Sequence, residues 1–189
     1  MQIKLILSDF DGTLVDTREA NFLAYREVLE EFGYTLTTAK YYAAFGLRFE
    51  EFMSDIGITD KDITALIKEK KAKTYPHYFN HLKLNQVLPG LIVKFRETGG
   101  KSGLVSTAQR NNLMNVLNHF DIAGLFDIIV SGDEVSAAKP DPGAYLYAIN
   151  QMGCQSGDTL IFEDSETGIE AARLSGASYI VISHAFFYH

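Results

Sequence analysis

The chain has 189 residues, with 17 Lys or Arg and 24 Asp or Glu, so its formal net charge is −7. A hydrophobic fraction of 47% and a charged fraction of 22% are typical of a globular protein and exclude a disordered or collagen-like chain. The acidic balance excludes a broad basic surface for nucleic acid or anionic lipid, but it is compatible with a local pocket for a small anion.

The absence of targeting signals and the cysteine content favour a cytoplasmic protein. No apolar run reaches the length of a membrane span. Residues 1–9 contain too short an apolar stretch for a signal peptide and reach an acidic residue too soon. The single cysteine, Cys154, has no second cysteine with which to form an internal disulfide. We therefore expect neither a membrane nor a nucleic-acid partner.

Five short apolar segments predict the strands of a buried sheet, at residues 3–8, 102–106, 126–130, 159–162 and 178–182. Helix-like segments separate the last four strands, at residues 109–119, 142–153 and 165–175. This alternation predicts an α/β fold with a Rossmann-like, doubly wound parallel sheet and helices on both of its faces.

The interval between the first two strands is far longer than one crossover needs and has helical patterning throughout. Asp60 is a plausible helix cap there, and Pro76 should end or kink the helix that follows. We expect an inserted helical domain at residues 17–84 and an α/β core formed by residues 1–16 and 85–189. A basic run at residues 70–73 is interpreted as a solvated helix face.

Paired carboxylates follow the first strand. Asp9 and Asp11 stand two positions apart, so in extended backbone they project to the same side, and Phe10 points into the core. Gly12 permits a sharp turn directly after them. Asp-Gly pairs also occur in ordinary turns, but the whole string Asp9–Asp16 at the end of a buried strand favours a reactive site.

Two further motifs stand near strand ends. Ser106 ends the second strand and Thr107 follows it, so a hydroxyl and backbone N–H groups there can hold phosphate oxygens; an ordinary helix cap is the alternative. Lys139 precedes Pro140, which favours an extended backbone before it. A lysine fixed in this way can neutralise a phosphate and a carboxylate together, although a solvent-exposed loop lysine is the alternative.

A second acidic pair, Glu163 and Asp164, follows the fourth strand. Two acids at the end of an apolar strand are costly without a cation, and Mg²⁺ is the natural one. Helix capping by Asp164 or Ser165 is the alternative, and it accounts for one acid but not for two.

In this order the motifs resemble those of the haloacid dehalogenase-like hydrolase superfamily, in the branch of phosphoglycolate phosphatases and β-phosphoglucomutases. The resemblance covers nearly the whole chain, and it includes the helical insert, which is similar to the cap domain of that branch. It implies a Mg²⁺-dependent phosphatase that hydrolyses a small phosphorylated metabolite through an aspartyl-phosphate.

The resemblance also implies roles for individual residues. Asp9 is the nucleophile, and Asp11 is the general acid and base. Mg²⁺ is held by Asp9, the Asp11 backbone carbonyl and Asp164, with Glu163 acting through water. Lys139 stabilises charge, and it binds phosphate together with Ser106 and Thr107. Arg48 is the candidate cap residue for substrate recognition; an exposed helix-face arginine is the alternative.

Two other functions remain compatible with these motifs. A phosphomutase acting on a hexose phosphate would use Asp9 and Asp11 in the same way, and the Glu-Asp-Ser form of the second acidic motif leans toward relatives that act on sugar phosphates. A non-catalytic sensor of a phosphorylated ligand is the third reading, and the presence of Asp9, Asp11, Lys139 and Asp164 argues against it. The oligomeric state stays open.

Overall fold

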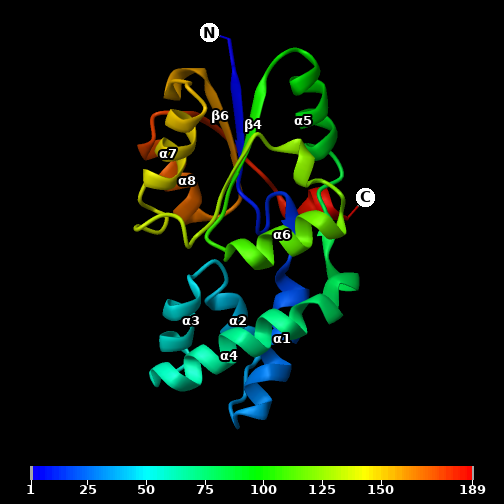
Figure 1. The fold of residues 1–189 in the computed structure, drawn as a ribbon, viewed down its shortest axis with the longest axis vertical. Coiled ribbons are helices and arrows are strands. Elements are labelled where there is room, and N and C mark those ends of the chain that lie inside the picture. Colours follow the sequence, from blue (N-terminus) through cyan, green and yellow to red (C-terminus); the bar gives the residue numbers. More distant parts are fainter. Residues whose placement is uncertain (1, 189) are drawn as a thin grey trace. The chain divides into compact units, whose positions relative to one another are not determined.

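The computed structural model describes residues 2–188 and divides the chain into two compact units (Figure 1). One unit comprises the chain up to Asp16 and again from Lys83 onward, and the other spans Thr17–Leu82. The first unit carries every strand of the described chain, and the second is helical.

A five-stranded parallel sheet forms the centre of the first unit, in the order β5-β4-β1-β6-β7. Its strands are β1 (Leu5–Ser8), β4 (Lys101–Val105), β5 (Ile128–Val130), β6 (Thr159–Glu163) and β7 (Ser178–Val181). The helices of this unit are α5 (Leu88–Glu97), α6 (Arg110–His119), α7 (Gly143–Gln151) and α8 (Glu166–Leu174). The predicted α/β fold class is confirmed.

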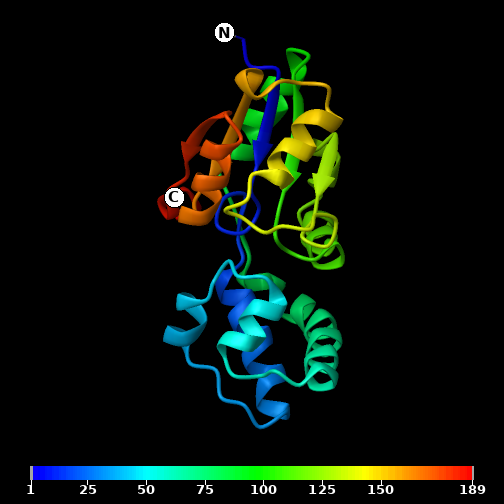
Figure 2. The same ribbon diagram turned by 90° about the vertical axis from the view of Figure 1, so that its left-hand side faces the viewer.

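The order of the strands fixes where a ligand can bind. From β1 the chain proceeds to β4 and β5 on one side, and it then crosses to β6 and β7 on the other. Right-handed crossovers therefore place α5 and α6 on one face and α7 and α8 on the opposite face (Figures 1 and 2). The direction of winding reverses between β1 and β6, and the crevice outside the carboxyl ends of two such strands is the usual ligand site.

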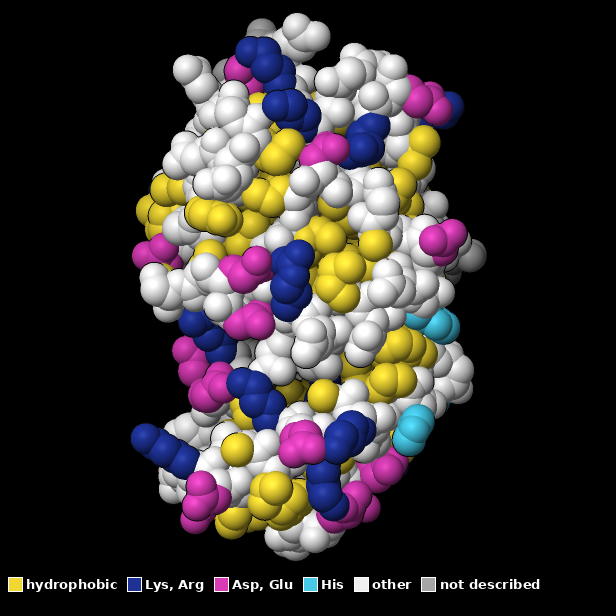
Figure 3. All heavy atoms as spheres, viewed as in Figure 1, with side chains coloured by type: hydrophobic (Ala, Val, Ile, Leu, Met, Phe, Trp, Pro, Cys, Tyr) yellow, Lys and Arg dark blue, Asp and Glu magenta, His cyan; other side chains and the backbone are white. Residues whose placement is uncertain are grey.

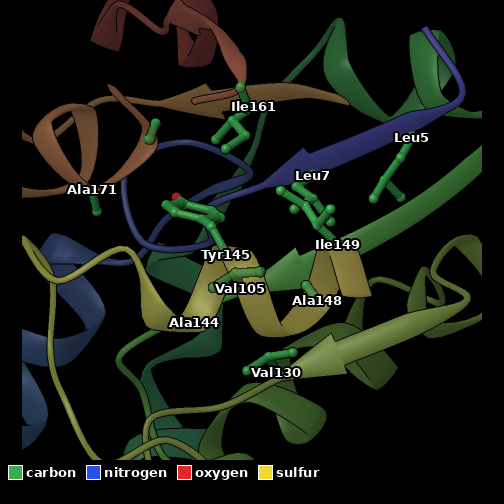
Figure 4. Close-up of a cluster of buried hydrophobic side chains, with 12 residues drawn as sticks. Leu5, Leu7, Val105, Val130, Ala144, Tyr145, Ala148, Ile149, Ile161 and Ala171 are labelled. Carbon is green, nitrogen blue, oxygen red and sulfur yellow. The ribbon is translucent and has the colours of Figure 1, made fainter. Parts of the chain in front are cut away.

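The core beneath α7 and α8 is made of small and branched side chains (Figure 4). It comprises Leu5, Leu7, Val105, Val130, Ala144, Tyr145, Ala148, Ile149, Ile161, Ala171, Ala172 and Ala177. Alanines on both helices let their backbones lie close to the sheet, which brings the first turn of α8 near the end of β6. Tyr145 is the one side chain of this cluster with a polar group.

A two-stranded antiparallel ribbon lies where the chain leaves and re-enters the first unit. It pairs β2 (Val15–Asp16) with β3 (Lys83–Leu84). Asn85, directly after β3, is buried; its amide donates to the Thr13 carbonyl, and its Oδ1 accepts the N–H groups of Val87 and Leu88. Sequence patterning predicts neither the ribbon nor α5.

The second unit contains α1 (Arg18–Glu31), α2 (Thr38–Ala43), α3 (Phe49–Asp55), α4 (Lys61–Thr74) and a 3₁₀ helix (Tyr75–His81). Asp60 caps α4 by accepting two N–H groups, and α4 ends just before Pro76, as predicted. The interpretation of residues 70–73 as a solvated face is wrong at Lys71. Its side chain is buried, donates to Asn21 and lies 3.9 Å from the centre of the Tyr75 ring.

Basic and acidic side chains are interspersed on each unit in the face that Figure 3 shows. No helix within residues 2–188 is both long and apolar enough to cross a lipid bilayer.

Candidate active site

The loop after β1 presents Asp9 at the carboxyl end of the sheet. Its N–H donates to the Phe162 carbonyl on β6 over 2.9 Å, so Asp9 continues the parallel pairing by one residue. The side chain of Asp9 is only 10% exposed. The chain then turns at Gly12, whose φ is +95° and whose absent Cβ would lie 2.1 Å from Asp164 Oδ2. Glycine is thus required both for the turn and for the close approach of Asp164.

Lys139 reaches the same place from the loop that precedes α7. Its ammonium donates to Asp9 Oδ1 at 2.5 Å and to Glu163 Oε1, and its side chain is 6% exposed. Burial opposes the charge of Lys139, but Asp9 and Glu163 outweigh burial and raise the pKa of the ammonium well above its usual range. Lys139 is therefore a fixed positive charge against Asp9, and not a solvent-exposed loop lysine.

Glu163, the last residue of β6, is fully buried and its two oxygens have separate partners. Oε1 accepts from Lys139 and, at 2.7 Å, from the Tyr145 hydroxyl. Oε2 accepts the N–H groups of Asp164 and Ser165 and the Ser165 hydroxyl. A Cβ on Gly168 would lie 1.9 Å from Oε1, so the carboxylate packs directly on the first turn of α8.

Asp164 follows Glu163 and turns to the β1 loop, where Thr13 Oγ1 donates to its Oδ1 over 2.9 Å. Burial, with the negative charges of Glu163 and Asp11 added, raises the pKa of Asp164 to about 6, although Thr13 acts in the opposite direction. Asp11 itself is half-buried on the loop after Asp9. Ser165, and not Asp164, caps α8 by accepting the Gly168 N–H.

Ser106 lies at the end of β4 and is 3% exposed. Its N–H donates to the Val130 carbonyl, and its Oγ accepts the N–H of Ala108 at 3.0 Å. This is a local turn at the same edge of the sheet as Asp9, and not a helix cap, because α6 begins only at Arg110. Thr107 is half-buried, and a Cβ on Gly132 would lie 2.1 Å from its carbonyl, so the loops after β4 and β5 are in close contact.

Arg48 belongs to the helical unit, where it stands at the start of α3 and is half-buried. Its N–H donates to the Glu51 carboxylate at 3.2 Å. The other sequence-predicted site residues all lie in the α/β unit, and Asp9, Lys139, Glu163 and Asp164 come together there.

The acidic cluster fits a divalent cation. Among the described residues, Asp9, Glu163 and Asp164 offer carboxylate oxygens that lie within 4.8 Å of one another. Burial and the charge of Glu163 raise the pKa of Asp9 well above its usual range, although Lys139 acts against them. Two buried acids and the half-buried Asp164 beside one ammonium leave excess negative charge, and oxygen ligands of this kind suit Mg²⁺.

Sequence patterning missed one group at this site. The Tyr145 hydroxyl contacts Glu163, and the centre of the Tyr145 ring lies 4.9 Å from Lys139 Nζ. Burial raises the pKa of Tyr145 well above its usual range, so the hydroxyl stays protonated. The only sequence signal is a tyrosine on the apolar face of a helix that begins just after Lys139.

Comparisons with known proteins agree with the motifs. The family model of haloacid dehalogenase-like hydrolases matches residues 6–182. A phosphorylated carbohydrates phosphatase of Thermotoga maritima is 27% identical over 184 residues, covering 94% of this chain and 84% of that protein. A β-phosphoglucomutase of Bacillus subtilis is 27% identical over 184 residues, covering 92% of this chain and 80% of that protein.

A solved structure extends the agreement to the fold. A haloacid dehalogenase-like hydrolase from Bacteroides fragilis superposes with a TM-score of 0.85 and 28% identity, over 97% of this chain and 89% of that one. The resemblance read from the motifs is thereby confirmed. Because the family model spans most of the chain and the strand order is that of a ligand-binding α/β sheet, this protein belongs to the haloacid dehalogenase-like hydrolases.

Proposed function

We propose that this chain is a Mg²⁺-dependent phosphatase of small phosphorylated sugars that acts through an aspartyl-phosphate on Asp9. The observation that carries the proposal is the convergence of Asp9, Lys139, Glu163 and Asp164 at the carboxyl ends of β1 and β6. The substrate class follows from the Thermotoga maritima relative, which is named as a phosphatase of phosphorylated carbohydrates.

Asp9 would act as the nucleophile. An Asp9 carboxylate oxygen attacks phosphorus, and the bond between phosphorus and the sugar oxygen breaks. Lys139, held on Asp9 Oδ1, reduces the repulsion between the carboxylate and the incoming phosphoryl group. Because this ammonium is buried, its effect is less screened by solvent than that of a surface lysine.

Asp11 would handle the proton in both steps. In the first step it gives a proton to the departing sugar oxygen, which leaves Asp11 ionised. In the second step it takes a proton from water as the water attacks phosphorus, which releases inorganic phosphate and regenerates Asp9. Such proton transfer to a leaving alcohol oxygen has no place in the cleavage of a carbon–halogen bond, so the presence of Asp11 favours phosphate esters.

The metal-holding groups would be Asp9, Asp164 and the Asp11 backbone carbonyl. When bound, Mg²⁺ supplies positive charge that offsets the phosphoryl oxygens and the carboxylates around them. Thr13 orients Asp164 for this task through the hydrogen bond to Oδ1. We keep Glu163 to a water-mediated contact, because both of its oxygens already accept hydrogen bonds.

Ser106 would hold a phosphoryl oxygen through its hydroxyl, because its N–H already donates to the Val130 carbonyl, and Thr107 would contribute its hydroxyl and backbone N–H. We assign to the helical unit the function of a cap, with Arg48 as its residue for substrate recognition. Replacing Arg48 by Ala should therefore raise KM for the preferred ester and leave the chemistry at Asp9 intact.

A screen of small phosphate esters for release of inorganic phosphate, with Mg²⁺ supplied, tests the proposal. We expect release that is abolished by EDTA and by Asp9→Asn. Asp158→Asn is the matched control, because Asp158 is a partly exposed acid just before β6, at the opposite end of that strand. An Asp9→Asn variant with full Mg²⁺-dependent turnover would contradict the proposal. A folded wild-type chain that binds these esters and releases phosphate from none would favour the sensor.

The second candidate function is a phosphomutase acting on a hexose phosphate, which the β-phosphoglucomutase relative favours. The two functions differ in what the phosphorylated Asp9 meets next, which is water in one case and a second sugar hydroxyl in the other. Conversion of a hexose 1-phosphate to the 6-phosphate that depends on a sugar bisphosphate activator, with little phosphate released, would establish the mutase.

A further inference from the structure

Tyr145 lies next to the reactive cluster, but no step assigned above uses it. The side chain is fully buried in the first turn of α7, six residues after Lys139. Figure 4 shows the ring among the apolar side chains of the core, with the hydroxyl oxygen directed away from Leu5 and Ile149. That hydroxyl donates to Glu163 Oε1 at 2.7 Å.

Glu163 Oε1 is the acceptor that Tyr145 and Lys139 share. The Lys139 ammonium bridges this oxygen and Asp9 Oδ1, so the position of Glu163 determines where the ammonium sits relative to Asp9. The other oxygen, Oε2, is held by the N–H groups of Asp164 and Ser165. Tyr145 is therefore the neutral donor that fixes the Lys139-facing side of the carboxylate.

The hydroxyl also limits how strongly Glu163 holds the lysine. A donated hydrogen bond withdraws charge from Oε1 and occupies one of its lone-pair directions, which weakens its competition with Asp9 for the ammonium. Without the hydroxyl, Oε1 has Lys139 as its remaining donor, and the ammonium would settle on Glu163 at the expense of Asp9.

We propose that Tyr145 is a positioning residue, whose hydroxyl fixes Glu163 so that Lys139 stays on Asp9. The inference rests on the proposed function, in which Lys139 stabilises charge as the phosphoryl group moves to Asp9. It predicts an effect on the chemical step and not on the binding of the ester, because the charge between Asp9 and phosphorus develops during the reaction.

Tyr145→Phe tests this, because it removes the hydroxyl and keeps the ring beside Lys139. We expect kcat to fall about tenfold with KM changed less than twofold, as for loss of a hydrogen bond that acts in the transition state. Tyr147→Phe is the matched control: Tyr147 lies on the same helix and is exposed, so its variant should keep wild-type kcat and KM. Wild-type kcat in Tyr145→Phe, or a change confined to KM, would overturn the inference.

A double-mutant cycle separates positioning through Glu163 from a general loosening of the core. In the Glu163→Gln background the Tyr145→Phe change should cost less than twofold in kcat, because the carboxylate that the hydroxyl fixes is gone. The same tenfold loss in both backgrounds would overturn the inference, since the hydroxyl would then act independently of Glu163.

Crystal structures of the wild type and of Tyr145→Phe make the result independent of the proposed function. We expect Lys139 Nζ to move away from Asp9 toward Glu163 in the variant, and superimposable lysines would refute the inference. If the wild-type protein released no phosphate from any ester, only the proposed function would be refuted. The two crystal structures would still decide the role of Tyr145.

Discussion

Gly168→Ala should damage the site although alanine is the better helix former. Gly168 lies in the first turn of α8, and a Cβ there would lie 1.9, 2.0 and 2.2 Å from Oε1, Cδ and Oε2 of Glu163. Ordinary contacts of a Cβ are 3.4–4 Å, so the carboxylate has to move by more than an ångström. It cannot do so and keep its hydrogen bonds to Tyr145 and Lys139.

The magnitude follows from the hydrogen bonds that break. Loss of two hydrogen bonds to a buried charged group costs about 3–6 kcal/mol, and replacing a helical glycine by alanine returns about 1 kcal/mol. We expect the free energy of unfolding to fall by roughly 2–5 kcal/mol, with kcat reduced about 100-fold because Lys139 loses its anchor.

Urea unfolding and phosphate release measure the two effects. Gly90→Ala is the matched control, because Gly90 also lies in a helix, α5, and a Cβ there meets no atom within 4 Å. That variant should be as stable as the wild type or slightly more stable, with full activity. A Gly168→Ala protein that behaves like Gly90→Ala would refute the packing of Glu163 against α8.

Three further perturbations test other parts of the account. Asp164→Asn should raise the Mg²⁺ concentration for half-maximal phosphate release about 10- to 100-fold, whereas Asp158→Asn should leave it unchanged; equal values in both variants would contradict the metal assignment. Burial alone would raise the pKa of Asp127, but the Arg96 guanidinium outweighs it and holds that pKa below its usual range. The ion pair therefore stabilises the folded chain at neutral pH, and this stabilisation is lost as the pH falls through the lowered pKa of Asp127. Asp127→Asn should lower the free energy of unfolding by roughly 1 kcal/mol at pH 7 and leave it unchanged in strong acid. A loss of stability that persists in acid would contradict this. Asn85→Ala should destabilise the chain by about 2–4 kcal/mol in urea, because two buried hydrogen bonds and one half-buried hydrogen bond are lost, and a neutral result would refute that role.

The sheet could be predicted because its strands are short apolar runs that end in polar residues. β1 ends one residue before Asp9 and β6 ends at Glu163, and apolar runs this short are more typical of strands than of helices. The ribbon of β2 and β3 was missed, since two residues per strand are too few to show alternation. The helix α5 was also missed; it has Pro89 and Gly90 in its first turn, where proline is well tolerated.

The charged residues of the site could be predicted, because the chemistry requires their residue types. The buried residue that contacts them could not, because many residue types can fill a core position. Asp9 and Asp164 directly follow buried strands, where their charges are costly without a partner, and Lys139 stands before a proline in the loop that precedes α7. From the sequence, Tyr145 is expected to be a core residue, because helical periodicity shows that it lies on the buried face of its helix but not where its hydroxyl points. The burial of Lys71 was missed because the lysines of a basic run are usually exposed, as Lys70 and Lys73 are, and because its partner Asn21 is far away along the chain.

Chemical trapping of the covalent intermediate would show whether the phosphoryl group passes to Asp9. Borohydride reduces an acyl phosphate to an alcohol, so enzyme quenched during turnover of a phosphate ester with Mg²⁺ should carry homoserine at position 9. Peptide mass spectrometry should find this change in the wild type and not in enzyme quenched without ester. An enzyme that turns over the ester and shows no reduction at Asp9, or shows it at another carboxylate, would contradict the account.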